Sequence, residues 1–269
     1  TSDGWSEAGK TATMPRSLEA FTVPGIPLIQ PGDDIAQLIL DGFDKEGGHL
    51  EEGDVVVIAQ KIVSKAEGRI VDLNTVVPSA RAKDVAKECL KDPREVEVIL
   101  SESSEIVRSA PGILIVLHHC GVILANAGMD RSNVASAPGE ENVLLLPTDP
   151  DRSSNSIREA LCRGSGKSLG VIINDSLGRP WRLGTTGVAL GVSGLPALLD
   201  LSGERDLFDR ELLVSQQAIA DELAAAASLL QGQGAEGSPV AVVRGFAAKP
   251  GDQEGAAALL RPRDEDLFR

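Results

Sequence analysis

The chain has 269 residues, enough for one large domain or two small ones around a buried core. Its composition is that of an ordinary globular protein, 42% hydrophobic and 25% charged, but only 3% is aromatic and Tyr is absent. The net charge of −14 disfavours nucleic-acid binding, because an acidic surface repels phosphate backbones and few rings remain for base stacking. No apolar run is long enough to cross a bilayer, so no membrane partner is expected.

The chain contains three widely spaced cysteines, Cys89, Cys120 and Cys162. None lies in a CxxC pair, and this pattern indicates reduced thiols in a cytoplasmic protein. The start of the chain lacks the apolar core of a signal peptide, and residues 1–19 are expected to be a flexible extension. Residues 20–248 are expected to form the folded domain, and residues 249–269 a polar, loose tail.

Apolar patterns predict the secondary structure in chain order. Residues 20–29 form a short strand that runs into a proline-containing loop, and Asp34 begins a helix. The β-branched run 53–60 is typical of a strand buried on both faces, and residues 112–128 form a hairpin. Further helices are predicted at 79–90, 93–108, 153–166 and 215–232, and further strands at 143–147, 169–176, 186–201 and 238–246. Strands and helices are therefore mixed, without a strict βαβα alternation.

The segment NAGMDRSNV, residues 126–134, is the first that could carry chemistry. It follows an apolar strand and places Asp130 and Asn133 in a loop of small residues. An ionised Asp is a hard oxygen ligand suited to Mg²⁺ or Mn²⁺, and Asn133 can hydrogen-bond a base or a sugar. The alternative is that Asp130 or Ser132 caps a helix.

The segment INDSLGRPWR, residues 173–182, is the second. Asp175 ends an apolar strand, Ser176 adds a hydroxyl oxygen, and Arg179 and Arg182 add positive charge. This combination fits a metal-bound phosphate or a substrate carboxylate. The alternative is a turn with an Asp cap and two solvated arginines.

Two further segments offer groups for phosphate. Lys61, Lys65 and Arg69 recur every four residues after the buried strand 53–60, and Lys can meet phosphate as a point charge. The loop QGQGAEGSP, residues 231–239, frees backbone amides at its glycines, although the chain has no GxxxxGK[ST] string. The alternative for the three basic residues is a solvated helical face, and the alternative for the loop 231–239 is a flexible connection.

Taken together, several long strings in a fixed order resemble the coenzyme F-420-0:L-glutamate ligase (gamma-glutamyl ligase) family over roughly residues 20–246. The strings are GIPLI (25–29), GDD (32–34), GDVVVIAQKIVSKAEGR (53–69), NAGMDRSNV (126–134), LLLPTDPD (144–151), GVIINDSLGRPWR (170–182), ADELAAAASLL (220–230) and PVAVVRG (239–245).

The resemblance implies an α+β fold with mixed, largely antiparallel sheets, packed helices and two intertwined subdomains, in a homodimer. It implies GTP as co-substrate, two divalent cations (Mn²⁺ or Mg²⁺) and K⁺ as cofactors. The implied reaction joins L-glutamate by an amide bond to coenzyme F-420-0, through an acyl phosphate, and further gamma-linked glutamates could follow. A ligase for another carboxylate acceptor and a non-catalytic nucleotide-binding homodimer are the alternatives.

The resemblance also implies roles for individual residues. Asp130, Asp175 and Lys65 would be catalytic, and the metal ligands would be Asp130, Asp175, Ser176 and Gln233. The nucleotide would contact Ile26, Pro27, Leu28, Ile29, Gln60, Lys61, Lys65, Asn133, Gly232, Gln233, Gly234 and Gly237. Some relatives have an acidic residue near the position of Gln233, and here Glu236 could substitute for it.

Overall fold

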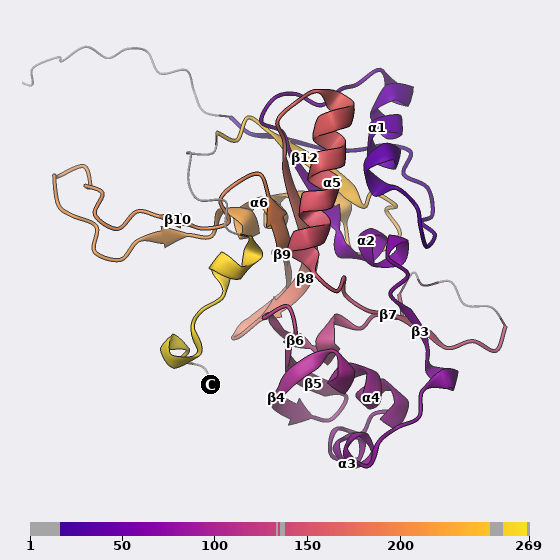
Figure 1. The fold of residues 1–269 in the computed structure, drawn as a ribbon. Helices are drawn as coiled ribbons and strands as arrows, with labels where there is room; N and C mark the ends of the chain where they lie inside the picture. Colours follow the sequence, from indigo (N-terminus) through magenta and orange to yellow (C-terminus); the bar gives the residue numbers. More distant parts are fainter. Residues whose placement is uncertain (1–16, 133, 135–137, 248–254, 268–269) are drawn as a thin grey trace, which may run out of the picture.

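A central five-stranded sheet organises the larger part of the protein, as the computed structural model shows (Figure 1). The structure describes residues 17–132, 134, 138–247 and 255–267. The strands, in spatial order, are β1 (Glu19–Thr22), β12 (Val240–Arg244), β2 (Val55–Ala59), β8 (Gly170–Arg179) and β9 (Arg182–Ser193). Only the β2–β8 pair of this sheet is parallel, and its other neighbours are antiparallel. The fold is therefore α+β with a mixed sheet, as predicted.

Helices cover both faces of this sheet. Helices α1 (Ile35–Glu46) and α5 (Pro150–Ser165) pack with Val56 and Ile58 of β2, whereas Val55 and Val57 face α6 (Ile219–Gln231). Successive strand residues point to opposite faces, so the continuous apolar run of β2 fills two cores at once. None of the helices in the described ranges is long and apolar enough to span a membrane.

Local capping fixes where α1 begins and ends. The side chain of Asp34 accepts a hydrogen bond from the backbone nitrogen of Gln37 at 3.0 Å, which satisfies one of the helix's open N–H groups. Gly47 ends the helix with a φ of 68°, a left-handed conformation that glycine adopts at little cost. The predicted helix start at Asp34 is confirmed.

A smaller lobe is inserted between α2 (Gln60–Ala66) and α5, and it lies below the central sheet in Figure 1. It contains β3 (Ile70–Asp72), α3 (Ala80–Cys89), α4 (Pro93–Ser101), β4 (Ser103–Ala110), β5 (Ile113–His118), β6 (Ile123–Ala125) and β7 (Asn142–Leu144). Strands β4, β5 and β6 form one antiparallel sheet, and β3 pairs with β7. The predicted hairpin at 112–128 is confirmed as β5 and β6.

One predicted helix of this lobe is wrong in its second half. The helix expected over 93–108 stops at Ser101, and residues 103–110 form β4 instead. β4 pairs with the apolar strand β5 along its whole length, with two register shifts. Pairing with a strong neighbouring strand outweighs the helical spacing, because strand formation depends on cross-strand packing more than on local propensity.

The described part of the C-terminal tail is packed, contrary to the expected loose tail. Ala256 is buried and its backbone nitrogen donates to Asp151 at 2.8 Å. Further on, the guanidinium of Arg263 forms an ion pair with Glu105 of β4. Residues 255–267 therefore run from the central sheet to the smaller lobe, in yellow in Figure 1.

A row of polar groups links the β5–β6 turn to the start of the smaller lobe. His118 is 2% exposed, its Nδ1 lies 3.0 Å from the sulfur of Cys120, and its Nε2 lies 3.5 Å from Glu102. Glu102 in turn pairs with Arg69. Burial lowers the pKa of His118, but the hydrogen bond with Cys120 and the nearby carboxylate of Glu102 outweigh it and raise the pKa to about 9.

The raised pKa of His118 predicts that the folded protein loses stability in mild alkali. A histidine whose pKa is raised on folding stabilises the native state fully below its unfolded pKa of about 6.5 and loses that contribution as pH rises through about 9. We expect urea denaturation to give a free energy of unfolding that falls between these pH values, by up to about 3 kcal/mol. The His118→Gln variant should be less stable at pH 6 and should lack this slope. A wild-type slope retained in His118→Gln would contradict the assignment.

Candidate active site

A large cleft of about 1790 Å³ opens between the central sheet and the smaller lobe. Every residue that the sequence predicted to be catalytic, nucleotide-binding or metal-binding lines it within the described ranges, from five separate chain segments. These residues are Ile26, Pro27, Leu28, Ile29, Gln60, Lys61, Lys65, Asp130, Asp175, Ser176, Gly232, Gln233, Gly234 and Gly237. Asn133 lies outside the described residues. The cleft thus brings together side chains that are far apart in the sequence, and their individual roles stay predictions.

Asp130 reaches the cleft through an unusual backbone path. Asn126, Ala127 and Gly128 all have positive φ values, between 51° and 68°, directly after β6. A side chain at Gly128 would meet Leu146 at 2.8 Å, so only glycine fits this bend. The chain then pairs with β7, because Asp130 and Leu144 exchange backbone hydrogen bonds of 3.0 and 2.8 Å. The bend therefore sets where the Asp130 carboxylate lies.

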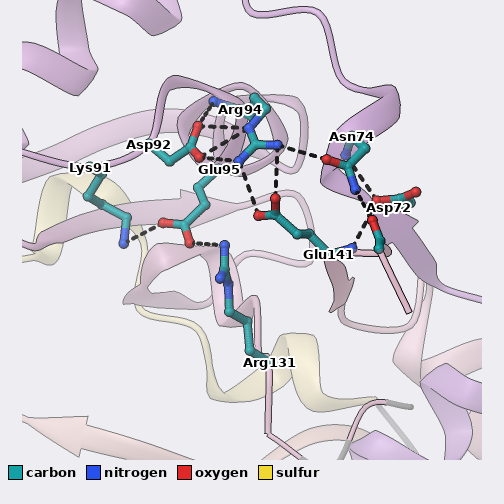
Figure 2. A network of polar contacts seen from close by, with 9 residues as sticks. Asp72, Asn74, Lys91, Asp92, Arg94, Glu95, Arg131 and Glu141 are labelled. Carbon is teal, nitrogen blue, oxygen red and sulfur yellow. Dashed lines mark hydrogen bonds and ion pairs between the residues drawn. The ribbon is translucent and has the colours of Figure 1, made fainter. Parts of the chain in front are cut away.

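An ion-pair network holds the residue after Asp130 against the smaller lobe (Figure 2). Arg131 pairs with Glu95 of α4 at 2.6 Å, and Glu95 also pairs with Lys91 at 3.1 Å. In the same network Arg94 bridges Asp92 and Glu141, which tie α4 to the segment that leads into β7. Figure 2 shows this row of charges running from α4 to Asn74 and Asp72. The Asp130 segment is therefore anchored on both sides.

The Asp130 carboxylate faces Lys61 across the cleft. Its Oδ2 lies 2.6 Å from the ammonium of Lys61, and its Oδ1 accepts from the backbone nitrogen of Ser132 at 2.6 Å. Burial alone would raise the pKa of Asp130, but the hydrogen bonds from Lys61 and Ser132 hold it below its ordinary value. No helix begins at Asp130 or Ser132 in the described residues, so the helix-cap alternative is wrong.

Asp175 lies next to this pair on the central sheet. In the parallel β2–β8 register Ala59 is opposite Asn174, so Gln60, the first residue after β2, lies level with Asp175 inside β8. Burial raises the pKa of Asp175, and the negative charge of Asp130 raises it further, against the lowering effects of Ser176, Lys61 and Gln60. Both carboxylates line the same cleft.

From the sequence, the strand was expected to end at Asp175, but β8 continues beyond this residue. It continues to Arg179 and returns as β9, so 173–182 is a hairpin and the turn with solvated arginines is only partly right. A register shift between Ile173 and Asn174 lets the strand change direction where it meets the cleft. Arg179 lines the cleft, whereas Arg182 is exposed and is not part of its lining.

The two lysines of α2 supply part of the positive charge of the cleft, together with Arg108 and Arg179. Lys61 and Lys65 are four residues apart and lie on one side of the helix, while Gln60 and Ser64 are buried and hydrogen-bonded to each other at 2.8 Å. Burial lowers the pKa of Lys65, and the charge of Lys61 lowers it further. A bound polyanion near Lys65 would offset this effect and favour its charged ammonium form. Arg69 instead turns to Glu102 and the Leu146 carbonyl.

The glycine-rich loop after α6 closes another side of the cleft. The amide of Gln233 donates to the hydroxyl of Ser176 at 2.6 Å, which ties the loop to β8. Glu236 accepts from the backbone nitrogen of Gly234 at 2.7 Å, and these backbone hydrogen bonds keep its pKa low. Glu236 is absent from the described lining of the cleft, and its role as a substitute for Gln233 stays a prediction.

The sequence interpretation missed Asn174, which lies at the floor of the cleft. Its side chain is 3% exposed, and its amide nitrogen donates to Gln231 at 2.8 Å. Its carbonyl oxygen is buried and has no hydrogen-bond partner among the described residues. A polar residue at the end of an otherwise apolar strand was the available signal.

The oxygen groups of the cleft fit a hard divalent cation. Two carboxylates, Asp130 and Asp175, lie beside the hydroxyl of Ser176 and the amide of Gln233. The pKa of Asp175 is raised first by burial and then by the negative charge of Asp130, and a cation bound here would favour the ionised carboxylate. Among the described residues no group of three or more His, Cys, Asp or Glu forms a metal cluster, so a cation here would keep open positions for water or phosphate.

The sequence was compared with protein-family models and with curated proteins. The family model described as "F420-0:Gamma-glutamyl ligase" matches residues 25–245. Proteins named "Coenzyme F420:L-glutamate ligase" from Methanothermobacter thermautotrophicus and Methanopyrus kandleri are 46% and 45% identical, over 92% and 94% of this chain and 97% and 99% of their own lengths. One of the same name from Haloarcula marismortui is 44% identical over 94% of this chain and 96% of its own length. The chain therefore belongs to the F420-0:gamma-glutamyl ligase family, a family of ligase enzymes.

Proposed function

We propose that this protein joins L-glutamate to coenzyme F-420-0 by an amide bond, with GTP as the source of energy. The observation that carries the proposal is the convergence of Asp130, Asp175, Lys61 and Lys65 in one cleft. Phosphoryl transfer requires positioned charges more than a nucleophilic side chain, so the cleft has the groups that this chemistry needs.

The nucleotide end of the cleft is assigned to the β1 side of the sheet. The apolar segment Ile26–Ile29 follows β1 and would contact the base, with Gln60 beside it. Lys61 and Lys65 would lie along the phosphates, and the loop 232–237 would close over them with its backbone amides. The depressed pKa of Lys65 is consistent with this role, since a polyphosphate would restore its preference for the charged form.

The proposed reaction has two steps. The free carboxylate of F-420-0 attacks the γ-phosphorus of GTP, the bond to the β-phosphate oxygen breaks, and GDP leaves. The α-amine of L-glutamate then attacks the resulting acyl phosphate at carbon, phosphate leaves with the bonding electrons, and the amine loses one proton. In both steps Lys61 and Lys65 offset negative charge that would otherwise repel the incoming carboxylate.

We assign Asp130, Asp175, Ser176 and Gln233 to divalent-cation binding. Two Mn²⁺ or Mg²⁺ ions there would supply Lewis acidity and neutralise phosphate charge. Lys61 now occupies the position of a counter-ion to Asp130, at 2.6 Å, so this lysine would turn to phosphate when a cation binds. Gln233 is a neutral ligand, and K⁺ completes the proposed set of ions.

We also propose a cytoplasmic homodimer. Strands β10 (Leu199–Asp200) and β11 (Gln216–Gln217) begin an arm that extends away from the body of the protein in Figure 1. The arm carries strongly exposed apolar side chains, namely Leu207, Phe208, Leu213 and Val214. A cluster of this kind is costly in water and is typical of a surface that another chain covers.

The direct test is incubation of the protein with F-420-0, GTP, Mn²⁺ and L-glutamate. We expect one GDP for each amide bond, and a product heavier than F-420-0 by one glutamate residue, read by mass spectrometry. A panel of other carboxylate acceptors and amino acids serves as the control. Turnover of another acceptor in preference to F-420-0 would replace the substrate assignment, and nucleotide binding without GDP release would contradict catalysis.

A further inference from the structure

The turn between β8 and β9 holds a tryptophan in a strained and exposed position. Trp181 has a φ of 56°, is 83% exposed, and lies on the lining of the cleft. A left-handed backbone is unfavourable for a bulky residue, and glycine or asparagine is the usual choice in such a turn. The fold therefore keeps a large ring at the rim of the cleft at the expense of backbone strain, which is a common feature of ligand-binding positions.

A face of the smaller lobe also lines this cleft, and it is apolar except for Arg108 of β4. Strand β5 alternates, so that Leu114 and Val116 are buried in the core of the smaller lobe while Ile113 and Ile115 line the cleft. Val107 of β4 and Ile123 of β6 continue the same lining. β6 also lies in contact with β8, so the hairpin and this sheet face line the same part of the cleft, here called the slot.

A cationic group lies beside the slot. The Nη1 atom of Arg179 is buried and has no hydrogen-bond partner among the described residues, although Arg179 lines the cleft. A buried guanidinium N–H without a partner is costly, and an oxyanion of a ligand would satisfy it with a charge-assisted hydrogen bond. Arg179 is on the same strand as Asp175, so such an anion would lie four residues along β8 from the proposed reaction centre.

We propose that the β8–β9 hairpin is the acceptor-binding element, and that it binds a planar heteroaromatic ring on Trp181 and a substrate oxyanion on Arg179. The ring of a deazaflavin lies between the indole and the apolar face of β5, and Arg179 binds the anionic chain attached to it. This inference rests on the proposed function and assigns its second substrate. It separates the two substrates in space, because the predicted nucleotide segment follows β1 and the hairpin is at the opposite edge of the sheet.

The ring contact can be tested by calorimetric titration of F-420-0 into the protein without L-glutamate. We expect Trp181→Ala to weaken binding at least tenfold, and Trp181→Phe only a few-fold, because stacking on an aromatic face is lost only in the first. Leu183→Ala is the matched control, since Leu183 is 99% exposed on the same hairpin and is not part of the cleft lining. All three variants should bind GTP and melt like the wild type.

The oxyanion contact is tested with Arg179→Gln and Arg179→Lys in steady-state assays. If the anion belongs to the acceptor, Arg179→Gln raises the KM for F-420-0 about tenfold or more and leaves the KM for L-glutamate unchanged. A rise only in the KM for L-glutamate would assign Arg179 to the amino acid and overturn its acceptor role. Arg179→Lys should recover part of the loss, because the ammonium group keeps the positive charge but lacks the paired N–H groups of the guanidinium.

These outcomes separate the inference from the function on which it rests. Equal affinity of wild type and Trp181→Ala for F-420-0, with normal product formation, would overturn the inference and leave the proposed function standing. Binding of F-420-0 that depends on Trp181 without any product would support the inference and contradict the ligase proposal. Absence of F-420-0 binding by the wild type would overturn both.

Discussion

The turnover of the Asp175→Asn variant should fall by a factor of about 100 to 1000, while its fold stays intact. Asp175 is the carboxylate that shares the cleft with Asp130, and it supplies negative charge where cations and phosphate are proposed to meet. Asparagine keeps the shape of the side chain and removes the charge. The measurement is GDP release and product mass under saturating F-420-0, GTP, Mn²⁺ and L-glutamate.

The same substitution should not reduce stability. Burial raises the pKa of Asp175, so its ionised form destabilises the native state at neutral pH, and this cost disappears when the charge is removed. A melting temperature equal to or above that of the wild type is therefore expected together with lost activity. A substitution that keeps or raises the melting temperature while it removes activity is typical of a charge that is retained for function.

Asp221→Asn is the matched control for this experiment. Burial also raises the pKa of Asp221, whose carboxylate accepts from the backbone nitrogen of Ala189 at 2.9 Å, but Asp221 is not part of the cleft lining. Its amide variant should be stable and active. Near-normal turnover of Asp175→Asn, or an equal loss in both variants, would contradict the role proposed for Asp175.

Removal of divalent cations should abolish turnover. With EDTA in excess we expect the rate of GDP release to fall at least a hundredfold, because the clustered negative charge of Asp130, Asp175 and a triphosphate would otherwise repel the acceptor carboxylate. Added Mn²⁺ or Mg²⁺ should restore the rate, and the melting temperature should change little in EDTA, because the cleft residues are held by protein contacts such as Lys61–Asp130.

Metal affinity gives a readout that does not depend on turnover. Titration of Mn²⁺ should show weaker binding in Asp130→Asn than in the wild type, and a smaller change in Gln233→Ala, because a neutral amide contributes less to cation binding than a carboxylate. Full activity of the wild type in EDTA would contradict the metal requirement. Unchanged Mn²⁺ affinity in Asp130→Asn would remove Asp130 from the proposed ligands.

Local sequence features were reliable where the physical cause is itself local. Asp34 caps α1, and the β-branched run at 55–59 forms a strand buried on both faces. Both depend on neighbours within one turn or one strand, so the pattern of a few residues is sufficient. The candidate segments at 126–134 and 173–182 were likewise visible as polar groups that follow apolar runs of the sequence.

Other features could not be read from local patterns. Residues 103–110 carry helical spacing but form β4, because the pairing partner β5 follows them in the chain. The tail after residue 254 is polar, yet Ala256 is buried and Arg263 pairs with Glu105, since surfaces built by other segments receive them. Asn174 was missed because its role depends on Gln231 of another element.

The sequence by itself determined the family, the α+β class and which segments carry the chemistry, because long ordered strings and local patterns do not depend on knowing the fold. Only the tertiary structure decided that Asp130 faces Lys61, that Asp175 lies beside them and that Arg179, not Arg182, enters the cleft. The reason is physical: strand pairing and lobe packing bring distant segments within contact distance, and charges interact strongly only over such short separations.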